Sequence, residues 1–75
     1  MNADLLKGTL QIKGYSIPAI VEKLEEEGVS MTKATFYKKL RGESQFNAKE
    51  ITAIAKIANL SKEEMYSIFF KELVS

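Results

Sequence analysis

The sequence predicts a compact all-α domain of five short helices, and three observations lead to that prediction. Apolar residues recur at spacings of three and four, which places them on one face of a helix. Two segments carry the capping-box pattern that begins helices, and glycines follow several of the apolar segments. No segment alternates polar and β-branched residues as an amphipathic strand would.

Length and composition exclude several classes of protein. With 75 residues, the chain is one domain (1–75) that buries about 60% of its unfolded surface, which leaves little room for a deep cavity. It contains no cysteine and no histidine, so disulfides, thiolate or imidazole metal sites and a histidine base are excluded. We therefore expect no enzyme activity, no cofactor, no metal and no small-molecule substrate. The short apolar runs predict no membrane partner, and the absence of cysteine fits a cytoplasmic location.

The first predicted helix covers about residues 3–12. Its apolar side is expected to hold Leu5, Leu6, Leu10 and Ile12. Gly14 is well placed to end it, because glycine adopts the left-handed backbone that follows many helices.

The second predicted helix covers about residues 18–27 and ends at Gly28. Either Ser16 or Ile17 is its N-cap, because a residue that precedes proline avoids the helical conformation. Pro18 fits the first turn, where its missing N–H costs nothing. One apolar stripe runs along it: Ile17, Ile20, Val21 and Leu24.

The third predicted helix covers about residues 33–40, with Ser30 or Thr32 as its N-cap and Gly42 after it. Phe36 and Leu40 are four residues apart and are expected to face the core together. Met31 is also expected to fill the core.

Two capping boxes predict the last two helices, over about residues 48–58 and from Ser61 to about residue 73. The boxes pair Asn47 with Glu50 and Ser61 with Glu64. The residues expected to point inward from these helices are Ile51, Ile54, Ala55, Ala58, Met65, Ile68, Phe69 and Leu73.

Charge is distributed unevenly along the chain. Residues 22–27 hold four glutamates against one lysine, a local charge of −3, whereas residues 33–49 hold five cations against one glutamate, a local charge of +4. A basic segment of this kind either faces phosphate or forms a solvated helix face.

The third predicted helix has a narrow apolar side and a mixed outer side. At 100° per residue, Ala34, Tyr37, Lys38 and Arg41 lie opposite the core side, with Lys33 at the start of the helix. A small residue lets a helix approach the major groove closely, and cations reach guanine edges or phosphates. Tyr37 either contacts the DNA backbone or fills the core. This pattern predicts that residues 32–42 bind double-stranded DNA.

Residues that flank this helix suit contacts to phosphate. Ser16 and Thr32 lie at helix N-termini, where free N–H groups attract anions. Lys39 lies to the side of the outer face and is expected to be solvated or to face phosphate. The acidic residues 25–27 are expected to point away from DNA. Further contacts to the same strand are expected from the loop residues Ser44, Gln45 and Asn47.

Four segments together resemble the lambda-repressor/Cro-type (XRE-like) helix-turn-helix regulators, especially those of phages and mobile elements of Gram-positive bacteria. They are SIPAIVEKL, MTKATFYKKLRG, FNAKEITAIAKIANLS and EEMYSIFF, and they cover nearly the whole chain. The resemblance implies a five-helix domain whose second and third helices dock on DNA, with two copies on a palindromic site. It places Thr32, Lys33, Ala34, Tyr37 and Lys38 on the reading helix and Ser16 at a phosphate.

The chain departs from the pattern of that family after Leu24. Seven residues, EEEGVSM, stand where the family has about three to five fewer. We expect either an extra turn on the second helix or a looser connector, and the angle between the second and third helices depends on which one forms.

The last predicted helix carries more apolar residues than one stripe needs. Tyr66, Phe70 and Val74 follow one another at spacings of four beside the inward stripe that contains Phe69. They form either a homodimer interface or a wider core. The alternative function is that of a protein-interaction module, similar to an anti-repressor or antitoxin, which uses Tyr66, Phe69 and Phe70.

Overall fold

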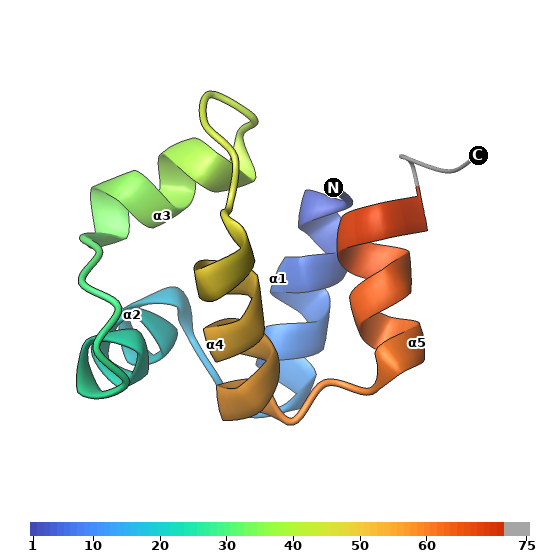
Figure 1. Cartoon of the computed structure of the whole chain (residues 1–75), viewed down its shortest axis with the longest axis horizontal. Coiled ribbons are helices and arrows are strands. Elements are labelled where there is room, and N and C mark those ends of the chain that lie inside the picture. The colour runs from blue at the N-terminus through green and yellow to red at the C-terminus, as the bar shows by residue number, and fades with distance from the viewer. Residues whose placement is uncertain (72–75) are drawn as a thin grey trace.

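A computed structural model describes residues 1–71 and confirms the predicted compact, all-helical fold (Figure 1). The helices are α1 (Ala3–Ile12), α2 (Ile17–Glu26), α3 (Lys33–Leu40), α4 (Ala48–Ala58) and α5 (Lys62–Met65). Helix α5 continues directly into a π-helical stretch, Tyr66–Phe70. Helices α1 and α4 lie in the middle of the molecule, with α2 and α3 on one side and α5 on the other.

Local signals set the ends of the helices. The residue before each α-helix, from Asn2 to Ser61, accepts a hydrogen bond from the backbone N–H three positions on, at 2.8–3.2 Å. Three glycines with φ between 81° and 92° follow α1, α2 and α3, and Asn59 with φ 53° follows α4. Helices α1, α3 and α4 therefore have the predicted bounds. Ser16 caps α2 and Thr32 caps α3, which settles both alternatives.

The core lies where α1, α2, α3, α4 and the π-helical stretch meet. Phe36 is fully buried, and its ring meets Phe46 edge-on at 5.1 Å between centroids, while Phe46 meets Phe69 in the same way at 6.1 Å. Leu40 and Met31 are buried as predicted. These contacts join α3 to the last helix through the loop that follows α3.

Helix α1 corrects one prediction about its apolar side. Leu6 and Leu10 are buried, but Leu5 is 39% exposed and Ile12 is 88% exposed. Ile12 is two residues beyond Leu10, about 200° around the helix, so it points away from the core. Thr9 completes the buried side instead.

The last helix separates the aromatic residues that the sequence grouped together. Phe69 is only 5% exposed and belongs to the core, so its assignment to a dimer interface is wrong. Tyr66 and Phe70 are 46% and 39% exposed. Leu73 and Val74 lie outside the described residues.

Candidate nucleic-acid interface

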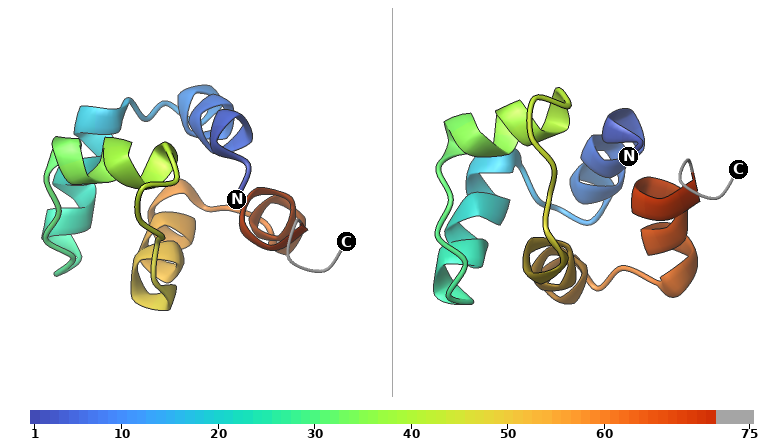
Figure 2. Two further views of the ribbon diagram at one scale, coloured as in Figure 1. Left: turned by 90° about the horizontal axis from the view of Figure 1, so that it is seen from above. Right: turned by 45° about the horizontal axis from the view of Figure 1, so that its top comes forward.

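Helix α3 forms an edge of the molecule. In Figure 1 it lies along the upper left, and no other element crosses it when the molecule is seen from above (Figure 2, left). Only Phe36 and Leu40 of its eight residues are buried. The predicted outer side is exposed throughout: Lys33, Ala34, Tyr37, Lys38 and Arg41. Tyr37 is 41% exposed, so it does not fill the core.

The cations of this outer side differ in their partners. Lys33 and Lys38 form no ion pair with any residue in 1–71. The Nε atom of Arg41 lies 2.5 Å from an Oε atom of Glu43, and both side chains are more than half exposed. An exposed pair of this kind contributes about 0–1 kcal/mol, so a phosphate can compete for the guanidinium.

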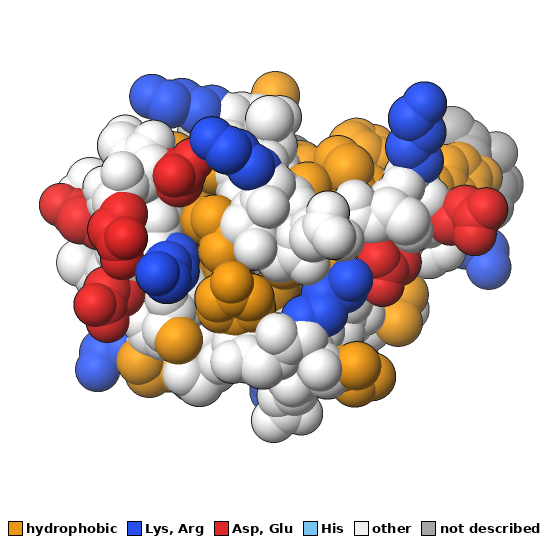
Figure 3. Space-filling model, turned by 90° about the horizontal axis from the view of Figure 1, so that it is seen from below, with side chains coloured by type: hydrophobic (Ala, Val, Ile, Leu, Met, Phe, Trp, Pro, Cys, Tyr) orange, Lys and Arg blue, Asp and Glu red, His pale blue; other side chains and the backbone are white. Residues whose placement is uncertain are grey.

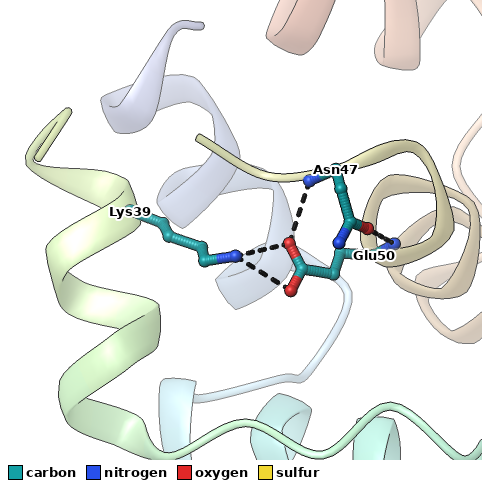
Figure 4. A network of polar contacts seen from close by, with 3 residues as sticks. All are labelled: Lys39, Asn47 and Glu50. Carbon is teal, nitrogen blue, oxygen red and sulfur yellow. Dashed lines mark hydrogen bonds and ion pairs between the residues drawn. The ribbon is translucent and has the colours of Figure 1, made fainter. Parts of the chain in front are cut away.

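Lys39 is neither solvated nor free to face phosphate, which corrects the prediction made for it. Its Nζ atom lies 2.6 and 2.9 Å from the two carboxylate oxygens of Glu50 (Figure 4). The side chains of Lys39 and Glu50 are only 11% and 12% exposed. The first turn of α4 lies beside α3 at this point, a proximity that no local sequence signal predicts.

The two residues that were predicted to contact phosphate, Ser16 and Thr32, cap helix N-termini. Ser16 Oγ accepts from the Ala19 N–H at 3.2 Å, and Thr32 Oγ1 accepts from the Thr35 N–H at 3.1 Å. Both cap residues are exposed. Helix α2 packs against α3, and its first turn, which Ser16 caps, lies next to α3 in both views of Figure 2.

The loop between α3 and α4 carries the remaining predicted contacts. Ser44 and Gln45 are exposed and line a groove of about 410 Å³, which also reaches Phe70 of the last helix. Asn47 uses its Oδ1 atom to accept from the Glu50 N–H at 2.8 Å. The acceptor of Asn47 is therefore occupied by the cap of α4, and only its amide N–H groups can donate to a phosphate.

The acidic side chains at the end of α2 lie away from α3. Three glutamates at the end of α2 are exposed: Glu25, Glu26 and Glu27. Seen from below, on the side opposite α3, acidic side chains gather at the left edge of the molecule (Figure 3). Glu27 binds Lys56 at 2.7 Å, and this hydrogen bond raises the pKa of Lys56 above its ordinary value. Helix α2 thus has its capped start beside α3 and its acidic residues at the opposite end.

The long connector is anchored at two points. It comprises the six residues 27–32, because α2 ends at Glu26 and α3 begins at Lys33. Val29 and Met31 are buried in the core, whereas Ser30 and Thr32 are exposed. The extra residues therefore form a connector held by alternate side chains, and contacts between α2 and α3 are kept.

Comparisons with known proteins add no relative: no family model, no curated protein and no solved structure matches the chain.

Within residues 1–71, no helix combines the length and the apolar character that crossing a membrane requires.

Proposed function

We propose that the protein is a sequence-specific DNA-binding regulator of the repressor type, which inserts α3 into the major groove. One observation carries the proposal. Helix α3 buries only Phe36 and Leu40, and its exposed side combines the small Ala34 with Lys33 and Lys38, two cations that have no ion-pair partner in residues 1–71. The resemblance of the sequence to lambda-repressor/Cro-type regulators supports the same role.

The dimensions of α3 suit the groove. Its eight residues span about 12 Å at 1.5 Å per residue. The helix diameter, about 10–12 Å with side chains, matches a major groove about 12 Å wide. Ala34 permits close approach or touches a thymine methyl group. Lys38 and Arg41 reach guanine edges or phosphates, and the Tyr37 hydroxyl can donate to a phosphate.

Residues around α3 would hold the DNA backbone. The N-terminus of α3 would offer phosphates the N–H groups of Lys33 and Ala34. That of α2 would offer the Ser16 hydroxyl and the Ile17 N–H, because Pro18 has no N–H and Ser16 already binds that of Ala19. Ser44, Gln45 and the amide of Asn47 would extend these contacts along the strand. The mechanism is occupancy of an operator in the cytoplasm, without a cofactor, and its affinity depends on salt because bound phosphates release counterions.

Selection of bound sites from a random-sequence duplex pool tests the function directly. We expect recovery of a common site, followed by loss of its binding in the Lys38→Ala/Arg41→Ala double variant when fluorescence anisotropy is measured. The matched control is Lys7→Ala/Lys62→Ala, which removes two exposed lysines on α1 and α5. Undiminished binding by the α3 variant would refute the assignment of the outer face. A wild-type protein that binds no duplex at low salt would refute the function.

Exposed aromatic residues on the last helix favour a homodimer as the binding form. Tyr66 and Phe70 are both more than a third exposed. A dimer through them would place two copies of α3 on the two halves of a palindromic site. Sedimentation equilibrium should show a dimer that Tyr66→Ser/Phe70→Ser dissociates. A palindromic selected site would agree with this, whereas no DNA binding would favour a protein-interaction module that uses the same two residues.

A further inference from the structure

The Lys39–Glu50 pair joins the two ends of the loop between α3 and α4. Lys39 lies in the last turn of α3, and Glu50 lies in the first turn of α4. Glu50 Oε1 accepts from Lys39 Nζ at 2.6 Å and from the backbone N–H of Asn47 at 2.9 Å (Figure 4). The carboxylate therefore holds both the side chain before the loop and the backbone at its end.

The geometry withdraws Lys39 from any role in attracting phosphate. Its ammonium is bound by both oxygens of Glu50 and also lies 5.8 Å from the centroid of the Phe46 ring. Glu50 therefore neutralises the charge of Lys39, and the Lys39 side chain is only 11% exposed. The neighbouring Lys38 has the same side chain but is exposed, and it forms no ion pair within residues 1–71.

A nearly buried ion pair acts more through its geometry than through its net stabilisation. Removing two charges from water opposes folding about as strongly as their attraction favours it, so such pairs are often weak contributors to stability. Their charged hydrogen bonds are nevertheless short and directional. At this position they connect the last turn of α3 to the first turn of α4, on either side of the loop that carries Ser44 and Gln45.

We infer that Lys39 is a positioning residue for DNA recognition: its pair with Glu50 aligns the outer face of α3 with the loop 41–47, so that base contacts and backbone contacts form at the same time. This inference rests on the proposed function. It assigns opposite roles to two adjacent lysines, Lys38 at the DNA and Lys39 behind the helix.

Two variants and two probes test the inference. Lys39→Met removes the charge but keeps a long side chain, and Glu50→Gln retains an oxygen for the Asn47 N–H but removes the pair. Lys62→Met is the matched control, because Lys62 is exposed on α5. The probes are a labelled duplex selected from a random pool and the unselected pool itself. Affinity is measured across a range of salt, at a temperature where circular dichroism shows each variant to be folded.

The positioning role predicts a loss of specificity with no loss of charge contacts. Lys39→Met should bind the selected duplex about tenfold more weakly, as when one base contact is lost, whereas its affinity for the pool should fall much less, through the unpaired charge of Glu50 alone, and its salt dependence should stay unchanged. Glu50→Gln should also weaken binding to the selected duplex. Electrostatic attraction alone predicts the reverse for this variant, because it removes a negative charge from the protein. Lys62→Met should change neither the affinity for the selected duplex nor the ratio of the two affinities.

Three results would overturn the inference. Equal weakening of both probes by Lys39→Met, with a smaller salt dependence, would make Lys39 a phosphate contact. Unchanged binding by folded Lys39→Met and Glu50→Gln would reduce the pair to a purely structural one. A wild-type protein that binds neither probe would refute the proposed function and this inference together, and it is distinguished from the other results because the variants play no part in it.

Discussion

Replacing Lys33 and Lys38 by methionine should lower the salt dependence of DNA binding by a predictable amount. Both lysines are exposed on α3, and neither has an ion-pair partner within residues 1–71, so each can neutralise one phosphate without first breaking another contact. Each neutralised phosphate contributes about 0.9 to the slope of log affinity against log salt concentration. Loss of both contacts should therefore reduce the slope by about 1.8.

This change in slope is large enough to measure with two salt concentrations. Between about 50 and 200 mM salt, a fourfold change, a slope difference of about 1.8 makes the affinity of the wild type fall about twelvefold more than that of the variant. Fluorescence anisotropy with a labelled selected duplex gives both values. Methionine keeps the length of the side chain and removes only its charge.

The control must separate local contacts from the overall charge of the protein. Lys7→Met/Lys62→Met removes the same two charges from α1 and α5 and should leave the slope near the wild-type value. An equal fall of the slope in both double variants would show that α3 has no privileged place at the DNA. An unchanged slope in the α3 variant would refute the reasoning directly.

Three further predictions concern the fold that supports the interface. Phe36→Ala should lower the free energy of unfolding by about 3–5 kcal/mol in urea denaturation, because Phe36 is fully buried against Phe46, and a loss below about 1 kcal/mol would contradict the described core. Gly28→Ala should lower the free energy of unfolding by about 1–2 kcal/mol, because the φ of Gly28 is 81°. Gly8→Ala should raise it by about 0.5–1 kcal/mol, because Gly8 lies inside α1 and no atom is within 4 Å of an added Cβ. Thermal unfolding in which both variants shift in the same direction would count against this backbone geometry. The hydrogen bond from the backbone N–H of Ser61, and after it the nearby Lys13, lowers the pKa of Glu64 from its ordinary value of 4.5. The ionised carboxylate therefore stabilises the fold when the pH is above 4.5, and this contribution is lost as the pH falls through the lowered pKa of the folded protein. Glu64→Gln should therefore lose less stability than the wild type during acid titration followed by circular dichroism, and an identical pH dependence would exclude this role.

The sequence alone located the helices and most of their ends, because the signals involved act over a few residues. Only the structure decided that Ser16 and Thr32 are the N-caps of α2 and α3 and that the last helix becomes π-helical at Tyr66. Asn47 and Ser61 each form a capping box with a glutamate three positions on, as predicted. Gly14 and Gly28 adopt the left-handed backbone that glycine tolerates best. Helix periodicity likewise identified Phe36 and Leu40 as core residues and left the outer side of α3 exposed.

Tertiary structure decided which exposed or charged residues have partners, because these depend on elements that meet from distant parts of the chain. Lys38 and Lys39 are neighbours of the same type, but only Lys39 faces the first turn of α4, where Glu50 binds it. Phe69 and Phe70 are likewise adjacent, yet only Phe69 reaches the core. Local sequence therefore set the helices and their faces, whereas packing between helices assigned Lys39 to the inside of the protein and left Lys38 for a partner outside it.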